Sequence, residues 1–138
     1  MTDVPRSFIE RQNEVLALFA DAYDDLDRYT VLIALGGMLE QPDSSFMTDD
    51  RLVKGCQSQV WLDLARSDGT LKLTAYSDTL IVRGLLYILQ QCINGVSAVE
   101  FLSGELFVFE RAGVSELLSP ARRSGLSSII SEIRRQAE

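Results

Sequence analysis

The only strongly nucleophilic side chains in this sequence are two thiols. The chain has 138 residues, two cysteines and no histidine. Without an imidazole there is no Ser–His or Cys–His catalytic pair, and a cysteine hydrolase lacks its usual general base. A closed zinc site needs four ligands, and an iron–sulfur site also needs several thiolates, so two cysteines are too few for either within one chain. The composition therefore excludes most enzyme and metal-site chemistry and leaves the two thiols to consider.

Cys92 is predicted to be a core residue. It falls inside a strongly apolar segment, beside Ile88, Leu89 and Ile93. A free cysteine among such neighbours usually behaves as a small hydrophobic side chain. We therefore expect packing from Cys92 and no chemistry.

Cys56 has different neighbours. It follows Gly55 and precedes a polar run at 57–59, at the junction of two predicted strands. A glycine there allows a tight turn and a loop tip that a partner can reach. Lys54 and Arg51 are near enough in sequence to favour the thiolate. On this spacing alone, a functional and a structural role for Cys56 stay equally open.

The overall composition is that of a folded domain with an acidic N-terminal third. Hydrophobic residues make up 46% of the chain, charged residues 24%, and the net charge is −7. We expect a single domain spanning residues 1–138. The charge argues against nucleic acid and against an anionic membrane as partners. Residues 1–50 hold eleven acids against three bases, which we interpret as a solvated helical face.

Targeting segments are not expected. The longest apolar stretch is far shorter than the roughly 20 residues that span a bilayer. Residues 1–20 mix charged and apolar residues and lack the continuous apolar core of a signal peptide. Thiols in a chain without an export signal indicate a reducing compartment. We therefore expect a soluble, cytoplasmic protein.

Helical periodicity dominates the first forty residues. It predicts an amphipathic helix over 7–22 and a second helix that begins after an N-cap at Asp24 and ends near 36–37. The inward face of the first helix is predicted to carry Ile9, Gln12, Leu16, Phe19 and Tyr23, and that of the second Tyr29, Leu32, Ile33 and Leu35. A polar loop over 42–50 follows.

From Leu52 the apolar period changes to two, which is typical of strands. Residues 57–64 and 71–76 alternate on either side of a Ser67-Asp68-Gly69 turn, the pattern of a β-hairpin. Residues 52–55 are predicted to add a short third strand. We therefore expect a small three-stranded antiparallel sheet.

The C-terminal half is predicted to be mainly helical. Ser77-Asp78 is expected to cap a helix from Thr79 to Cys92, which should be the most buried helix of the domain. Residues 103–112 fit a strand or a short helix equally well. Ser119 as N-cap and Pro120 at the first helical position open the last helix. The predicted fold class is α+β, with helices packed on the sheet.

Three blocks of sequence resemble the motifs of one family. They are GCQSQVWL at 55–62, SDTLIVRGL at 77–85 and LSPARRSGL at 118–126. In this order they resemble the SufE/CsdE family, the sulfur-acceptor partners of cysteine desulfurases. The resemblance begins at about residue 8 and is weak over 96–113, and Arg83 stands where the family often has lysine.

The resemblance implies a sulfur carrier with a SufE/IscU-like fold. Cys56 would accept persulfide sulfur from a pyridoxal-phosphate-dependent desulfurase of the SufS or CsdA type and stimulate that enzyme. It would then pass the sulfur to a SufB-like scaffold of iron–sulfur cluster assembly. Such exchange is attack of a thiolate on sulfur, so it needs no resident cofactor or metal. In the family the sulfur is sheltered in an apolar cavity, which protects a persulfide from oxidants and reductants.

The motifs also suggest which residues support Cys56, although several roles stay open. Gly55, Gln57, Ser58 and Gln59 are expected to shape the loop or to line a partner contact. Asp78 is expected to cap its helix and to face the loop. Arg122 is expected either to contact the desulfurase or to bind an acid on this chain.

Two other classes of function also stay open at this point. One is a regulatory module that stimulates a desulfurase without carrying sulfur, and the other is a thiol-dependent hydrolase. We expect a monomer or a weak homodimer.

Overall fold

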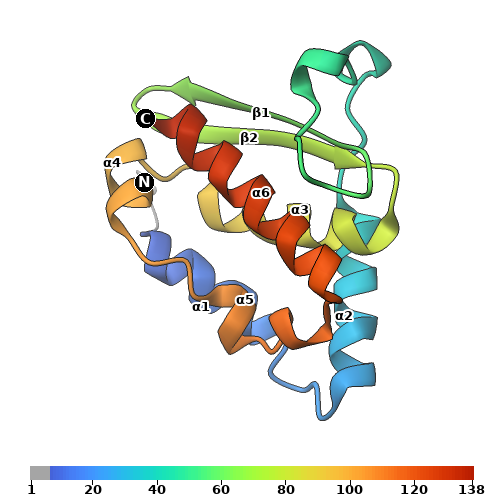
Figure 1. Cartoon of the computed structure of the whole chain (residues 1–138). Coiled ribbons are helices and arrows are strands. Elements are labelled where there is room, and N and C mark those ends of the chain that lie inside the picture. The colour runs from blue at the N-terminus through green and yellow to red at the C-terminus, as the bar shows by residue number, and fades with distance from the viewer. Residues whose placement is uncertain (1–6) are drawn as a thin grey trace.

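The computed structural model describes residues 7–138 and has an α+β architecture (Figure 1). The helices are α1 (Phe8–Leu18), α2 (Asp25–Met38), α3 (Leu80–Ile93), α4 (Ala98–Ser103), α5 (Val108–Arg111) and α6 (Pro120–Ala137), and the strands are β1 (Val60–Ser67) and β2 (Thr70–Ser77). The prediction of no signal peptide concerns residues 1–20, and residues 1–6 of that segment lie outside the described range. No helix within it is long and apolar enough to cross a membrane.

The strands form an antiparallel hairpin whose turn matches the prediction. The ladder runs from Val60 opposite Ser77 to Ser67 opposite Thr70. Both turn residues have positive φ, 53° at Asp68 and 79° at Gly69. Asp-Gly suits such a tight hairpin turn because aspartate tolerates that conformation and glycine adopts it freely.

The prediction of a third strand is wrong. Within residues 7–138 the sheet has two strands, and Leu52 makes only an isolated bridge to Trp61. A 3₁₀ turn ends at Arg51 immediately before this bridge, and Gly55 turns the chain with φ 89° immediately after it. The extended segment between them is too short to build a ladder.

Amide side chains close the outer edge of β2. The Leu73 N–H donates to Asn94 Oδ1 at 2.7 Å, and the Leu73 carbonyl accepts from Gln90 Nε2 at 3.1 Å. Two residues earlier on β2, the Leu71 N–H donates to the Val96 carbonyl, and the Leu71 carbonyl accepts from the Gly95 N–H. Because an isolated hairpin is marginal in water and an open edge invites further pairing, these contacts stabilise the sheet.

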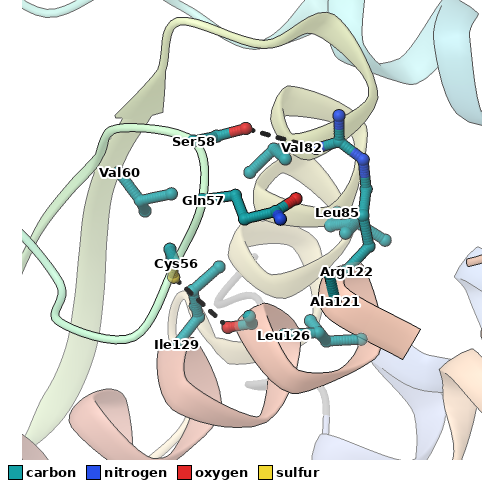
Figure 2. A pocket seen from close by; sticks show the side chains of 11 residues that line it. Cys56, Gln57, Ser58, Val60, Val82, Leu85, Ala121, Arg122, Leu126 and Ile129 are labelled. Carbon is teal, nitrogen blue, oxygen red and sulfur yellow. Dashed lines mark hydrogen bonds between the residues drawn. The ribbon is translucent and has the colours of Figure 1, made fainter. Parts of the chain in front are cut away.

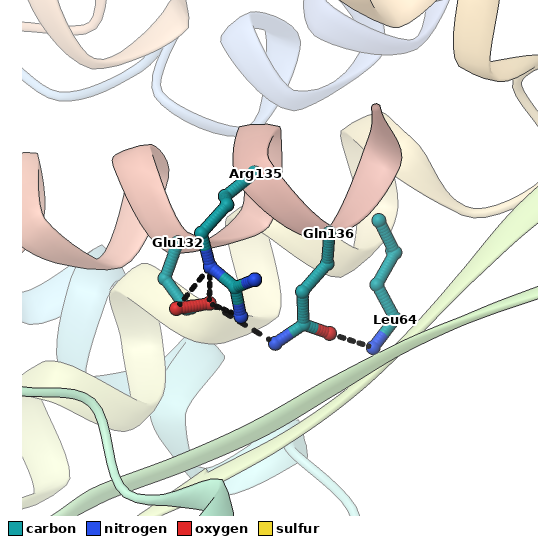
Figure 3. Close-up of polar contacts among 4 residues, drawn as sticks. All are labelled: Leu64, Glu132, Arg135 and Gln136. Atoms are coloured by element: carbon teal, nitrogen blue, oxygen red, sulfur yellow. Dashed lines mark hydrogen bonds and ion pairs between the residues drawn. The ribbon is translucent and has the colours of Figure 1, made fainter.

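The edge of β1 is covered by the end of α6. The Leu64 N–H donates to Gln136 Oε1 at 2.9 Å, and Gln136 Nε2 donates to Glu132 (Figure 3). Glu132 is also paired with Arg135, and hydrogen bonding from Arg135 lowers the pKa of the Glu132 carboxyl. The C-terminal end of α6 is thereby fixed against the sheet. The N-terminal half of the same helix lines the candidate site.

Helix α3 is the centre of the core, as predicted. Its buried residues are Val82, Gly84, Leu85, Leu86, Ile88, Leu89, Cys92 and Ile93. It contacts β2, α1 and α2. The approach to α2 is close: an added Cβ at Gly84 would lie 2.3 Å from the Leu32 carbonyl oxygen, and one at Gly36 would lie 2.5 Å from that of Leu80. Neither position has room for a side chain.

The first helix is shorter than predicted, the second ends at Met38 close to its predicted end, and parts of both predicted inward faces are wrong. Helix α1 ends at Leu18, so Tyr23 lies beyond it with 90% of its surface exposed. Ile9 and Tyr29 are also exposed. Phe8 is buried in place of Ile9, whereas Gln12 and Phe19 are buried as predicted. The Asp24 cap is confirmed: its side chain accepts from the Asp27 N–H.

The undecided segment 103–112 is helical at its end, where α5 lies. Gln12 holds this region to α1, and it is completely buried. Its Oε1 accepts from the N–H groups of Phe107 and Val108, at 2.8 and 3.2 Å, while its Nε2 donates to the Glu105 carbonyl. A buried amide thereby satisfies the backbone groups that precede and open α5.

Candidate functional site

Cys56 lies on a loop that precedes β1 and rests on α6 (Figure 2). Gly55 has φ 89°, and a Cβ added there would lie 2.7 Å from Ser128 Oγ. The loop backbone therefore approaches α6 closely, in a conformation that favours glycine. The Cys56 Sγ donates to the Gly125 carbonyl oxygen at 3.5 Å.

The thiol of Cys56 borders a small pocket, mostly apolar, between the loop, α3 and α6 (Figure 2). The lining residues are Cys56, Gln57, Ser58, Val60, Val82, Leu85, Ala121, Arg122, Gly125, Leu126 and Ile129. The centre of a water-sized sphere can move through about 20 Å³ there. About 10–15 Å³ by this measure holds one water molecule. The pocket therefore has room for about one atom beyond Sγ.

Burial raises the pKa of the Cys56 thiol above its ordinary value of 9.0. Burial alone causes this shift of the pKa, so the expectation that Arg51 and Lys54 favour the thiolate is wrong for this conformation. Arg51 is turned toward Phe46, donating to its carbonyl at 3.0 Å and lying 4.7 Å from the centre of its ring. The thiol in this position is consequently protonated at neutral pH and a weak nucleophile.

Asp78 faces the loop, as expected, but it does not cap α3. The cap position is Thr79, which makes no side-chain capping bond. Asp78 Oδ1 instead accepts from the Gln59 N–H at 3.1 Å, and Ser77 Oγ donates to the Gln59 carbonyl at 2.7 Å. The carboxylate therefore bonds to the backbone just before β1 and not to the start of α3.

Arg122 reaches the same loop from α6. Its Nη1 donates to Ser58 Oγ at 3.2 Å, and Ser58 Oγ lies 2.7 Å from Thr79 Oγ1 (Figure 2 shows the Arg122 contact). Within residues 7–138, then, the partner of Arg122 is a hydroxyl and not an acid. Gln57 is exposed beside the pocket that it helps to line. The structure thus brings together all the residues predicted from the motifs.

Sequence reasoning missed three residues that lie against the cysteine loop: Thr79, Gly125 and Ser128. Gly125 lies three residues after Arg122 on α6, so helical spacing from Arg122 could have placed it near the loop, and Ser128 is three residues further on. Thr79 lies between Asp78 and α3, where a capping role was assumed for its neighbour. The apolar lining of the pocket comes from residues whose alternation and periodicity indicated only that they are buried.

The second thiol lies apart from this site. Cys92 is completely buried in α3, and burial raises its pKa to about 12, slightly opposed by the charge of Arg11. This confirms the prediction of a core residue. In the described part of the chain, no group of three or more cysteine, aspartate and glutamate side chains is arranged to hold a metal ion.

Comparisons with known proteins agree on one family. A family model named SufE, described as an Fe–S metabolism associated domain, matches residues 13–137. A SufE-like protein of Rhizobium etli is 33% identical over 138 residues, covering 96% of this chain and 93% of its own. One of Rhizobium meliloti is 36% identical over 125 residues, with coverages of 87% and 88%. One of Haemophilus influenzae is 32% identical over 110 residues, with coverages of 78% and 87%.

A solved structure has the same fold. The solution structure of a hypothetical protein from Thermus thermophilus superposes with a TM-score of 0.75. The match covers 92% of this chain and 93% of the other, at 19% sequence identity. At that identity the match supports the architecture alone.

Proposed function

Because the chain belongs to the SufE family, whose domain is associated with Fe–S metabolism, we propose that it is a sulfur acceptor. Cys56 receives the outer sulfur of a persulfide from a cysteine desulfurase and passes it to a scaffold on which iron–sulfur clusters are built. The whole chain serves as one acceptor domain. It works as a partner of the desulfurase, which it stimulates, and not as an independent enzyme.

The observation that carries this proposal is the pocket at Cys56. It is lined mainly by aliphatic side chains, and beyond Sγ it has room for about one atom. An outer persulfide sulfur is one atom, and it is easily oxidised or reduced in water. A pocket of this size fits a carrier that must hold one extra sulfur away from small thiols.

The reaction needs only the thiol. The Cys56 thiolate attacks the outer sulfur of the donor persulfide, a new S–S bond forms, and the S–S bond of the donor breaks. The donor leaves as a thiolate and takes up the proton that Cys56 lost. One thiol and one persulfide thus give one persulfide and one thiol, with no net oxidation and no resident cofactor.

Transfer requires the loop to leave the pocket. In the closed position Sγ is half-buried against the pocket, and burial keeps its pKa raised, so a partner sulfur meets a partly covered, protonated thiol. Moving outward exchanges the Gly125 hydrogen bond for solvent and returns the thiol pKa toward its ordinary value. A docking partner then selects the open state by binding it more tightly than the closed one.

The test is the intact mass after incubation with a cysteine desulfurase, pyridoxal phosphate and free cysteine. The native chain and the matched control Cys92→Ser should each gain one sulfur that a reductant removes. Cys56→Ser should gain none. If native chain and Cys56→Ser stimulate desulfurase turnover equally and neither gains sulfur, the protein is a regulatory module and the proposal fails.

A further inference from the structure

Four side chains beside the cysteine loop form one continuous hydrogen-bonded chain. Arg122 Nη1 lies 3.2 Å from Ser58 Oγ, Ser58 Oγ lies 2.7 Å from Thr79 Oγ1, and Thr79 Oγ1 lies 3.1 Å from Asp78 Oδ1. It begins at a guanidinium and ends at a carboxylate.

The charged ends fix the direction of every proton in this chain. A guanidinium only donates hydrogen bonds, and an ionised carboxylate only accepts them. Arg122 therefore donates to Ser58, and Thr79 donates to Asp78. The Ser58 proton is left to point at Thr79, which has an acceptor lone pair free. Each hydroxyl thus donates once and accepts once, and both ends are charge-assisted.

This chain joins three parts of the fold at the loop. Arg122 belongs to α6, Thr79 and Asp78 precede α3, and Ser58 lies two residues after Cys56. On the other side of Cys56, the Val53 N–H donates to the Val60 carbonyl at 2.8 Å. The segment that carries the thiol is therefore held at both of its ends.

We propose that Thr79 is a positioning residue for Cys56: its hydroxyl links Ser58 to Asp78 and so holds the loop in the pocket. The purpose of this hold, sheltering a carried sulfur, rests on the proposed function. The contact itself does not, because it governs access to the thiol in the free chain.

The hydroxyl of Thr79 has no role in α3 that would explain it otherwise. Threonine at an N-cap ordinarily accepts from a backbone N–H two or three residues on. Here no such bond is made. The helix therefore loses no cap when the hydroxyl is removed, whereas the Ser58 hydroxyl loses its acceptor.

The test measures how fast iodoacetamide alkylates Cys56 in the free chain, read from the mass of the Cys56 peptide. Thr79→Val keeps the shape of the side chain and removes the hydroxyl, and we expect the rate to rise about three- to tenfold. Thr79→Ser restores the hydroxyl and should return the rate to the native value. Thr70→Val is the matched control, since its hydroxyl bonds only within the hairpin turn, and it should change nothing.

Two results overturn the proposal. One is a native alkylation rate in Thr79→Val, and the other is an equal rise in Thr79→Ser. If Thr79→Val does not fold, Ser58→Ala interrupts the same chain and must raise the rate; an unchanged rate is then decisive. Alkylation involves no desulfurase, so this result is independent of whether the chain accepts sulfur.

Discussion

The two thiols of this protein are both shielded, and they are shielded in different ways. Cys92 is part of α3 and is completely buried in the core. Cys56 is half-buried on a loop, beside a pocket with space for about one more atom. Burial raises the pKa of each thiol, strongly at Cys92. The difference teaches that burial alone makes a cysteine inert, whereas burial on a separable loop can make its reactivity conditional.

The contacts that hold the two thiols explain this difference. Exposing Cys92 requires α3, the central helix, to leave the core. Exposing Cys56 requires only the loss of its bond to the Gly125 carbonyl and of the loop's contacts with α3 and α6. The first movement amounts to unfolding, while the second is local and costs a few hydrogen bonds.

The largest expected effect is the difference in alkylation between the two thiols of the native chain. With a pKa of about 12, about one Cys92 thiol in ten thousand is ionised at pH 8, and the core excludes the reagent. We expect iodoacetamide to modify Cys56 at least about a hundredfold faster than Cys92. Peptide mass analysis over time measures both rates in one sample.

The control for this comparison is the same reaction in urea. Once the chain is unfolded, both thiols are equally accessible and the two rates should become similar. Equal rates in the native chain would contradict the assignment of Cys92 to the core.

A smaller effect is expected from changing the glycine that turns the cysteine loop. Gly55→Ala places a side chain at φ 89° and 2.7 Å from Ser128 Oγ, so the loop backbone is strained and either the Ser128 hydroxyl turns away or the loop shifts from α6. Gly69→Ala carries the same kind of backbone strain, about 1–2 kcal/mol, in a turn where nothing lies within 4 Å of the added atom.

Both variants should lose a similar amount of stability, and they should differ at the thiol. We expect about tenfold faster alkylation of Cys56 in Gly55→Ala and the native rate in Gly69→Ala. Urea unfolding measures the first quantity and peptide mass analysis the second. A native rate in Gly55→Ala would mean that the loop does not depend on this contact.

Much of the fold could be predicted because its signals are local. The Asp68-Gly69 turn, the Asp24 and Ser119 caps and the apolar periodicity of α3 each depend on residues within a few positions of one another. Such patterns specify elements whatever surrounds them. The third strand failed for the opposite reason, since a strand forms only if a partner and enough length are both present.

The candidate site divides in the same way. Its sequence motifs identified the loop around Cys56 and the arginine that reaches it, Arg122. The partner of Asp78 was missed because local sequence favours a cap, while the actual donor, the Gln59 N–H, is 19 positions away. Thr79 was missed because its hydroxyl contacts Ser58 only after the hairpin has brought the two segments together. Long-range contacts of this kind leave no periodic signal.

An effect that is absent at neutral pH and appears only above pH 9 is a pH dependence of stability that belongs to Cys92. Its pKa is about 12 in the folded chain, above the ordinary 9.0. Below pH 9 the Cys92 thiol is protonated in both the folded and the unfolded chain, and its contribution to the free energy of unfolding is fully present. Between these values only the unfolded chain releases its proton, so the free energy of unfolding falls by about 1.4 kcal/mol per pH unit as pH rises.

The measurement that isolates this term is urea unfolding at several pH values from 8 to 11, in the native chain and in Cys92→Ala. The two chains differ only at residue 92, so every other contribution cancels in the difference between the two curves. The native curve should fall more steeply above pH 9. Cys56→Ala should stay closer to the native slope, because its thiol is only half-buried. Parallel native and Cys92→Ala curves would show that the core tolerates the thiolate, and the contrast between the two thiols would then rest on access alone.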